Sequence, residues 1–548
     1  MTRSADQLVD EILEFIWQEN PVEATMAGIH RYDDRLERCD LVSRRNKLRR
    51  KKEYVAGIET LQKDGQSNDE LDLLCCALRV GIETEERLRT LDRDPGIYPR
   101  LILYGVYQLI ARSDEPYHYR ALRAIERMRE VPRLLSEGRL NLSYGDGVPR
   151  LWNQAAIDFM YAGRQYLDHI TALLASEVPE LSEVLRKYAE EALASFDSYL
   201  EFLQDEVVTS AGGSFGVGGE MLSFLIRYEH KLDSSVDQLR EMAHEEAALA
   251  LSGLEQAAAS LGGDSGWRQW LSKIDQSPAP DDLRAWWEGI VNEVRQAVDG
   301  AGLVTLPPAG GLSIVETPPF EQPTTPVAGY IPAAPLEENS RAFFCVTSGA
   351  AAGEEPSRRA ETINWHSRPR ALMYVIRELY PGRHTLLTLR RAANPRLAYL
   401  TCHNLLEDGW CSYAVDLVLE AGLIEDPSLR LLAAHEKLVA AWRMLTDLEI
   451  HTDTLDEPGA IEKLAANTGL SSEEAAFEVR RLAINPAASL GAVVGRRQIE
   501  SLRRDLSAGQ PDGLPLRQFH DDLLRLSALP AGRLAARLSR ELEKRRKQ

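Results

Sequence analysis

Apolar residues recur with the period of an α-helix through most of this chain of 548 residues. Between residues 68 and 205, stretches with apolar positions three or four apart follow one another without a fixed repeat period. This pattern predicts an all-α fold, and the chain is long enough to bury a large core. Three of the stripes are Leu71, Leu74, Cys75, Leu78 and Val80; Ala121, Ile125, Met128 and Val131; and Ala192, Phe196, Leu200 and Phe202.

The composition changes between Leu306 and Leu336, where prolines are frequent. Proline lacks a backbone donor and interrupts helices, and the nearby pieces 312–315 and 343–347 are β-prone. We therefore expect a mainly helical protein with a small β segment near residues 310–350. The predicted parts are an N-terminal helical lobe at 1–300, a proline-rich irregular and β segment at 301–360, and a C-terminal helical lobe at 361–548.

Two segments of the C-terminal lobe combine apolar helices with charge. Residues 371–376 form an apolar, helix-compatible run that brings Arg377 and Glu378 into the interior, and Pro381 must kink or break that helix. A second apolar helix, predicted to begin near Leu397, carries Asp408, Trp410 and Tyr413. Isolated buried charges are costly, so these groups should be paired, metal-bound or functional.

These segments resemble the signature of the DUF885 family, "domain of unknown function 885", regarded as zincin-like helical metallopeptidases. The signature is His-Glu-x-x-Pro-Gly-His-His, followed about one helix later by Glu-Gly-Trp-Ala-x-Tyr-x-Glu. The resemblance implies a two-lobed zincin- or neurolysin-like fold, a cleft lined by the 301–360 segment, and zinc. It covers nearly the whole chain, because further blocks are similar at 20–34, 329–332, 343–347, 443–451 and 478–495.

The chain departs from that signature at the metal ligands. Arg377 and Arg383 stand where the family has histidines, and only His384 remains of the three. Asp408 and Val415 replace the two glutamates of the second block. A catalytic zinc needs three imidazole or carboxylate ligands and an open position, and arginine has no lone pair to offer. The chain is therefore interpreted as a degenerate, metal-free member with no cofactor.

The altered site has two non-catalytic interpretations. In the first, Arg377 and Arg383 supply the positive charge that the metal once gave and form a structural salt-bridge network with Glu378 and Asp408. In the second, the arginines and His384 exceed the neighbouring carboxylates, and the cleft binds a small carboxylate or a peptide terminus. We favour the structural network, which predicts that the protein lacks peptidase activity.

Two catalytic interpretations remain open, so the sequence does not decide whether the protein is an enzyme. A repurposed hydrolase or lyase would use Glu378 as general base and His384 or Tyr413 as acid, with the arginines holding an oxyanion. An altered metallohydrolase would instead bind its metal through Glu378, His384 and Asp408, although two neighbouring guanidinium groups would repel the ion.

Residues outside the two motifs are further candidates for ligand binding. Arg443, Asp447 and His451 follow one another at spacing four and would share one helix face. The resemblance places this block near the cleft, and Tyr330 lies in the segment that it implies as cleft lining. We expect an ion-pair ladder at 443–451 rather than catalysis.

Residues 44–52 hold seven basic side chains in nine positions. Such a run is typical either of a nucleic-acid or partner patch or of a solvated helix face. The formal net charge of the whole chain is −20 at pH 7, which disfavours a nucleic-acid partner. We therefore interpret the run as a solvated face.

The cysteine pattern and the N-terminal residues bear on location. Six cysteines include no Cys-x-x-Cys pair, and reduced, mostly buried thiols fit a cytoplasm best. Met1–Asp6 lead into the helical pattern of Gln7–Trp17 without a signal-peptide pattern. No apolar run approaches the roughly 18 to 20 residues that a membrane span needs. We expect a cytoplasmic protein that does not cross a membrane.

Overall fold

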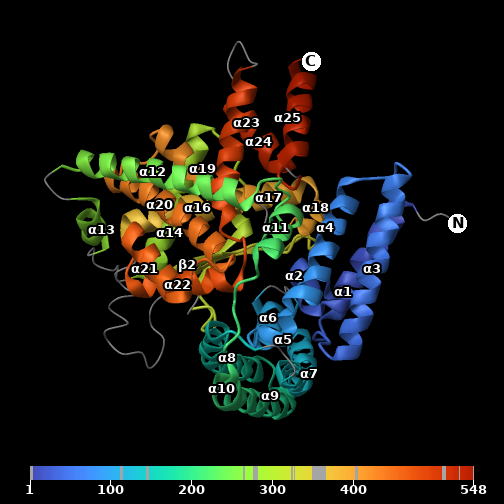
Figure 1. Ribbon diagram of the computed structural model, residues 1–548. Helices are drawn as coiled ribbons and strands as arrows, with labels where there is room; N and C mark the ends of the chain where they lie inside the picture. The colour runs from blue at the N-terminus through green and yellow to red at the C-terminus, as the bar shows by residue number, and fades with distance from the viewer. Residues whose placement is uncertain are drawn as a thin grey trace. The chain divides into compact units, whose positions relative to one another are not determined.

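The computed structural model describes residues 4–111, 115–143, 147–262, 266–275, 282–322, 325, 327–347, 366–401, 405–508, 514–529 and 531–546. Helices make up most of these residues, and the strands among them form one small sheet (Figure 1). The prediction of a mainly helical protein with a small β segment near residues 310–350 is confirmed.

The chain divides into two compact units. Unit 1 comprises Met1–Val217, Pro318–Thr324 and Ala334–Arg341, and unit 2 comprises Gly218–Thr317, Thr325–Ala333 and Ala342–Gln548. In this division the helices between residues 219 and 301 belong to the same unit as the C-terminal half. The long helix α12 (Val236–Ser260) buries its apolar stripe along α20 (Pro427–Ile450), beside which it lies in Figure 1.

Unit 1 is an assembly of amphipathic helices. Their starts follow from capping: Ser4 and Gln7 form a reciprocal capping box at α1, and Asp40 accepts backbone hydrogen bonds at the start of α3. Its helices are α1 (Ala5–Glu19), α2 (Pro21–Ala27), α3 (Leu41–Lys63), α4 (Asp69–Glu83), α5 (Thr90–Arg93), α6 (Ile97–Ala111), α7 (Tyr117–Ser143), α8 (Arg150–Glu177), α9 (Ser182–Phe202) and α10 (Val208–Ser210).

Unit 2 contains the remaining helices and the sheet. Its core gathers large apolar side chains such as Trp287, Trp410 and Phe519, which are fully buried. In addition to α12 and α20, its helices are α11 (Gly219–Tyr228), α13 (Trp267–Asp275), α14 (Leu283–Ala301), α16 (Arg368–Glu378), α17 (Arg383–Ala393), α18 (Pro395–Leu400), α19 (Leu405–Glu420), α21 (Glu457–Thr468), α22 (Ser472–Ile484), α23 (Arg496–Ala508), α24 (Leu516–Leu526) and α25 (Ala531–Arg546).

The sheet of unit 2 has the strand order β1-β3-β2, with β1 (Leu312–Glu316), β2 (Ala328–Ile331) and β3 (Ala342–Val346). The central strand β3 is parallel to β1 and antiparallel to β2, with Tyr330 of β2 opposite Phe344 of β3. Phe344 is buried against Trp287 of α14, with ring centroids 5.3 Å apart. The sheet therefore presents Tyr330 beside the unit 2 core.

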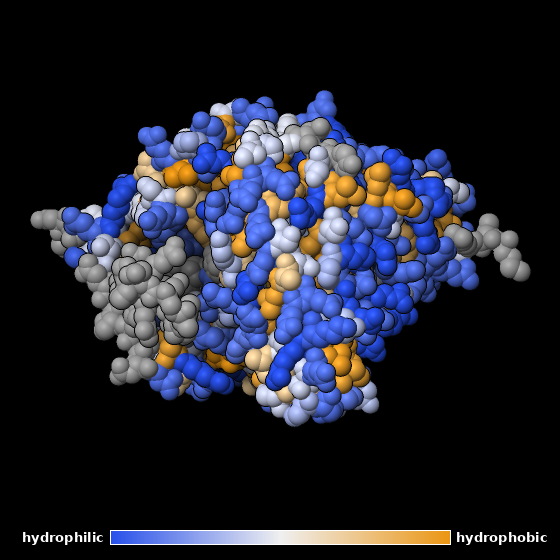
Figure 2. Space-filling model, turned by 90° about the horizontal axis from the view of Figure 1, so that it is seen from below, coloured by the Kyte–Doolittle hydropathy of each residue, from blue (hydrophilic) through white to orange (hydrophobic). Residues whose placement is uncertain are grey.

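The face drawn in Figure 2 is mainly hydrophilic, and its hydrophobic residues form small separate groups. This is the surface expected of a chain whose formal net charge is −20. Among the described helices, none combines the length and the apolar composition needed to cross a bilayer.

A backbone contact between glycines joins α19 to the π-helical turn η6 (Gly491–Gly495), which leads into α23. A Cβ atom on Gly495 would lie 1.8 Å from the carbonyl oxygen of Leu405, and one on Gly409 would lie 2.2 Å from the carbonyl carbon of Gly495. Neither position has room for a side chain, so the two backbones can approach closely only because both residues are glycine.

We expect Gly495→Ala to lower the free energy of unfolding by about 3 kcal/mol, because its methyl group would collide with backbone that cannot move aside. The control is Gly289→Ala on the exposed side of α14, where a Cβ atom meets nothing within 4 Å. That substitution should instead stabilise the protein by roughly 0.5–1 kcal/mol through helix propensity. Urea denaturation measures both, and equal effects would contradict the close packing.

Candidate functional site

The two motif helices meet at a sharp turn in unit 2. As predicted from Pro381, α16 ends at Glu378, and α17 begins at Arg383. Gly382 lies inside the turn, where a Cβ atom would be 1.8 Å from the carbonyl oxygen of Arg377. The indole Nε1 of Trp410 donates to the carbonyl oxygen of Pro381 at 2.8 Å and ties α19 to this turn.

The second motif lies on α19, which begins at Leu405. The predicted start near Leu397 is wrong, because 395–400 form the separate helix α18, capped by the side chain of Asn394. Residues 402–404, between the two helices, lie outside the described residues. Asp408, Trp410 and Tyr413 are on α19 as predicted.

Arg383 binds three carboxylates with three different nitrogens. Its Nε donates to Glu378 Oε2 at 2.7 Å, its Nη1 to Glu407 Oε1 at 2.6 Å and its Nη2 to Asp408 Oδ1 at 2.8 Å. The side chains of Arg383, Glu378 and Glu407 are at most 20% exposed, whereas that of Asp408 is 43% exposed. Burial lowers the pKa of Arg383, but the surrounding anionic groups more than offset this effect, and the pKa is raised overall.

A second arginine extends this cluster. The fully buried Arg390 of α17 donates from Nη1 to Glu407 Oε2 at 3.3 Å and from Nε to the hydroxyl of Ser527 at 2.9 Å. Among the described residues, the cluster of Glu378, Arg383, Arg390, Glu407 and Asp408 thus combines two guanidinium groups with three carboxylates. Its formal charge is −1, so it has no excess positive charge.

Arg377 does not belong to this cluster. Its Nη1 donates to Glu436 Oε2 of α20 at 2.5 Å, and both side chains are about one third exposed. Burial alone raises the pKa of Glu436, but Arg377 and Arg443 reverse the effect and hold it below its ordinary value. The two motif arginines are therefore neutralised by different carboxylates.

His384 turns away from Arg383 and toward the sheet. Its Nδ1 lies 3.0 Å from the hydroxyl of Tyr330, and its ring packs edge-on against Tyr380. Burial and the nearby charge of Arg295 lower the pKa of His384 to about 4, so the ring is neutral near pH 7. Its Nε2 is buried and has no hydrogen-bond partner within the described residues.

Tyr413 of α19 belongs to a separate polar group, which it forms with His520 and Arg503. Its hydroxyl is 3.0 Å from Nε2 of His520, and it also accepts a 3.0 Å hydrogen bond from Nη1 of Arg503. Burial lowers the pKa of His520 to about 4 and raises that of Tyr413 to about 12. Tyr413 therefore faces α23 and α24 rather than Glu378.

The 443–451 block of α20 is not a continuous ion-pair ladder. Arg443 donates to Glu478 Oε1 at 2.6 Å. Asp447 instead accepts hydrogen bonds from the backbone amides of Ala487 and Ser489, and His451 lies 3.5 Å from one of its oxygens. The Nε2 of His451 is also 2.9 Å from the carbonyl oxygen of Leu482. These contacts hold the segment after α22 against α20.

The arrangement does not fit the zinc that the resemblance implies. Glu378 and Asp408 both bind the guanidinium of Arg383, and His384 bonds to Tyr330. A zinc ion shared by these three residues would have to displace Arg383 from its carboxylates. Within the described ranges, no three His, Cys, Asp or Glu side chains are grouped so that they could hold a metal ion.

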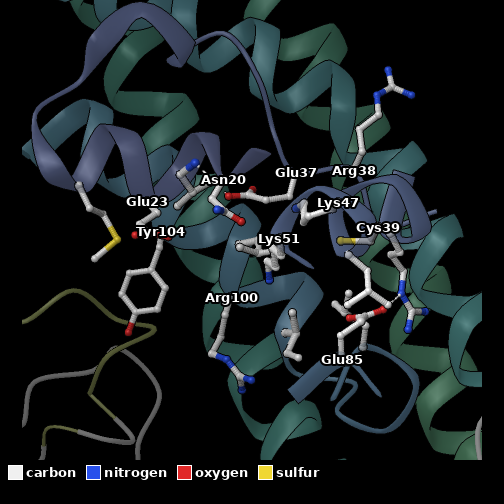
Figure 3. A pocket seen from close by; sticks show the side chains of 17 residues that line it. Asn20, Glu23, Glu37, Arg38, Cys39, Lys47, Lys51, Glu85, Arg100 and Tyr104 are labelled. Carbon is white, nitrogen blue, oxygen red and sulfur yellow. Dashed lines mark hydrogen bonds and ion pairs between the residues drawn. The ribbon is translucent and has the colours of Figure 1, made fainter. Parts of the chain in front are cut away.

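A pocket lies in unit 1, away from both motifs in sequence (Figure 3). The sequence did not identify two partners of the motif arginines. One is Glu407, which directly precedes Asp408 and binds Arg383. The other is Glu436, which lies 59 positions from its partner Arg377. Arg390 and His520 carried no signal in the sequence, since their partners come from distant helices.

Comparison with known proteins gives a family and a fold. The family described as "Bacterial protein of unknown function (DUF885)" matches residues 21–538. No curated protein matches the sequence. A "putative lipoprotein of unknown function" from Shewanella oneidensis is similar in structure, with a TM-score of 0.77 and 18% identity over 97% of this chain and 99% of that one. A "putative lipoprotein" from Colwellia psychrerythraea has a TM-score of 0.80 and 16% identity over 99% of this chain and 100% of that one.

These similarities correct the predicted location. The expectation of a cytoplasmic protein is contradicted by the description of both similar structures as a "putative lipoprotein". The prediction rested on the cysteine pattern, the N-terminal residues and the lengths of the apolar runs.

We expect Arg383→Met to lower the free energy of unfolding by about 3–5 kcal/mol, since it leaves Glu378, Glu407 and Asp408 close together without their shared cation. The matched control is Arg368→Met, whose pair with Glu293 is about half exposed and should contribute less than about 1 kcal/mol. Denaturant titration of both variants tests the cluster. Similar small losses would mean that Arg383 does not hold it together.

We expect stability to fall as the pH drops from about 6.5 to 4. In that window unfolded His384 and His520 bind protons, whereas the folded protein, with both pKa values near 4, does not. Each histidine contributes roughly 3 kcal/mol over the whole window. His384→Gln should flatten the pH dependence of the unfolding free energy. The exposed His118→Gln should leave it unchanged, and equal curves for wild type and His384→Gln would contradict the assignment.

Proposed function

The chain belongs to the DUF885 family of bacterial proteins, and we propose that it is a metal-free, peptidase-inactive member in which Arg383 takes the structural place of a metal ion. The observation that carries this proposal is the binding of Glu378, Glu407 and Asp408 by the single guanidinium of Arg383. Like a metal ion, this guanidinium neutralises carboxylates from two helices and fixes their relative position.

The charge of the cluster supports a structural role rather than an anion site at the motif. Each motif arginine is already bound by carboxylates, and the cluster around Arg383 has a formal charge of −1. An incoming carboxylate or peptide terminus would have to compete with Glu378, Glu407 and Asp408 for the same donors. The balance of charge therefore favours a salt-bridge network that stabilises the junction of α16, α17 and α19.

The contacts of the candidate acid and base give less support to a repurposed hydrolase or lyase. Within the described residues, the hydrogen-bonding partner of Glu378 is Arg383, whose Nε donates to Oε2 of the candidate base. His384 bonds to Tyr330, and Tyr413 bonds to His520 and Arg503. The three candidate catalytic side chains thus have different partners and form no common hydrogen-bonded group.

Peptide hydrolysis by this class of site depends on a metal ion that polarises the carbonyl group and lowers the pKa of the attacking water. Without metal ligands the motif residues provide neither effect. Our proposal therefore includes the absence of peptidase activity.

We expect the protein, after zinc loading and desalting, to retain no stoichiometric zinc and to cleave no substrate of a peptide panel. The comparison variant combines Arg377→His, Arg383→His and Asp408→Glu, which restores the family's ligand types at these positions, and it should retain more zinc than the natural sequence. Elemental analysis and peptide mass spectrometry measure the two properties. One tightly held zinc per natural chain, or peptide cleavage lost in Glu378→Gln, would refute the proposal.

A further inference from the structure

A pocket of about 430 Å³ lies within unit 1, among α2, α3, α6 and the segment around Glu37 (Figure 3). This volume is within the range of small-molecule sites. One face of α3 lines it with Arg44, Lys47, Leu48 and Lys51, which are spaced at i, i+3, i+4 and i+7. The pocket is therefore built into the helix packing and does not depend on loops alone.

The basic run at 44–52 is thus divided between two faces of α3. The prediction of a simple solvated face holds for Arg45, Arg49 and Lys52, which are exposed. Arg44, Lys47 and Lys51 line the pocket instead. A run with seven basic side chains in nine positions therefore directs three of them to the pocket.

The basic side chains of the pocket differ in how they are neutralised. Arg44 binds Glu85 at 2.7 Å and Asp92 at 2.5 Å, and Arg100 pairs with Asp94. Figure 3 shows the guanidinium of Arg38 pointing away from the other labelled side chains. These arginines leave little positive charge for a ligand.

Lys51 differs from the arginines. Within the described residues its Nζ has one hydrogen-bond acceptor, the carbonyl oxygen of Gly81 at the long distance of 3.5 Å, and no carboxylate within ion-pair distance. Gly81 itself makes room for the amine, because a Cβ atom there would lie 2.8 Å from Nζ. Lys47 lies one turn away on the same face and donates to the carbonyl oxygen of Glu19 at 2.9 Å. Burial and the charge of Lys47 lower the pKa of Lys51.

Glu37 gives a second, independent sign of a ligand. Its side chain lines the same pocket and the residue is only 5% exposed. Its Oε1 accepts the backbone amide of Val22 at 3.0 Å, but its Oε2 is buried without a hydrogen-bond partner among the described residues. Buried polar atoms rarely lack a hydrogen-bond partner, so we expect a polar group of a ligand to bind this oxygen in the pocket.

Part of the remaining wall is apolar, although Asn20, Glu23, Glu85 and Tyr104 also line the pocket. Met26 of α2, Leu48 of α3, and Ile97 and Leu101 of α6 face the same space. A ligand that satisfies both kinds of wall must combine an anionic group with an apolar body.

We propose that this pocket binds a small carboxylate ligand with an apolar body, whose carboxylate is bound by Lys51. The ammonium group of Lys51, which has no carboxylate within ion-pair distance among the described residues, gains a counter-ion from the ligand. Glu37 Oε2 provides the second polar contact and donates a hydrogen bond to the ligand when its carboxyl group is protonated. Burial raises the pKa of Glu37, which favours that form. The apolar body lies against Leu48, Ile97 and Leu101.

Octanoate is a suitable probe, because it carries one carboxylate on an apolar chain. We expect octanoate to raise the melting temperature of the full-length protein by mass action. Acetate has the charge without the apolar body, and octanamide has the apolar body without the charge. At equal concentrations both should produce much smaller shifts.

Two lysine variants locate the site. Lys51→Met should weaken octanoate binding by about tenfold or more, since a charge-assisted hydrogen bond is lost. Lys52→Met is the matched control, because Lys52 is exposed and pairs with Glu86 on the solvent face. It should bind octanoate like the wild type. Titration calorimetry on both variants measures the difference.

Without ligand, Lys51→Met should be at least as stable as the wild type, because it removes a partly buried charge that has no counter-ion within the described ranges. A clear loss of stability in this variant would assign Lys51 a structural role and overturn the proposal. It would also be overturned by the absence of an octanoate shift in the wild type, by equal octanoate binding in Lys51→Met, or by an equal response to octanamide.

Discussion

One guanidinium group joins the helices of the motif region. Arg383 is the first residue of α17, and it binds Glu378 at the end of α16 and Glu407 and Asp408 in the first turn of α19. Breaking a buried pair costs more than the pair contributes, because the remaining charge is stranded. The interior at this junction therefore depends on the charge of one side chain, while Gly382, Gly409 and Gly495 allow the backbones to come close enough for the pairs to form.

Unit 1 buries an arginine in a different way. Arg127 is fully buried and donates from Nε to the carbonyl oxygen of Arg35 at 3.1 Å and from Nη2 to the hydroxyl of Thr25 at 2.5 Å. Burial lowers the pKa of Arg127, whereas the pKa of Arg383 is raised. Both guanidinium groups have their hydrogen bonds satisfied, but Arg383 has three carboxylates as direct partners and Arg127 relies mainly on neutral acceptors. A buried arginine is therefore held mainly by neutral acceptors in unit 1 and by carboxylates in unit 2.

The charged groups of the molecule separate into satisfied and unsatisfied sets. At the motifs, Arg377, Arg383 and Arg390 each have a carboxylate partner, which favours a structural role there. Two buried atoms of the motif residues, Nε of Arg377 and Nε2 of His384, also have no partner among the described residues. Among the described residues around the unit 1 pocket, Lys51 has a distant carbonyl oxygen as its hydrogen-bond acceptor, and Glu37 has a buried oxygen without a partner. Unpaired buried polar atoms reduce stability, and proteins retain them mainly where a ligand or a function compensates. This contrast favours the pocket among the N-terminal helices as a ligand site over the motif residues that the resemblance emphasises.

The sequence by itself determined the features that depend on local spacing. Helical periodicity predicted the fold class, the prolines and β-prone pieces predicted the small sheet, and Pro381 predicted the break between α16 and α17. The replacement of histidines by Arg377 and Arg383 is likewise visible in the sequence alone. Only the tertiary structure decided the partners: Arg377 binds Glu436, Tyr413 binds His520, and Lys51 faces a pocket while its neighbour Lys52 faces solvent. The physical reason is that periodicity specifies which face of a helix is buried, whereas ion pairs and pockets depend on which distant helix covers that face.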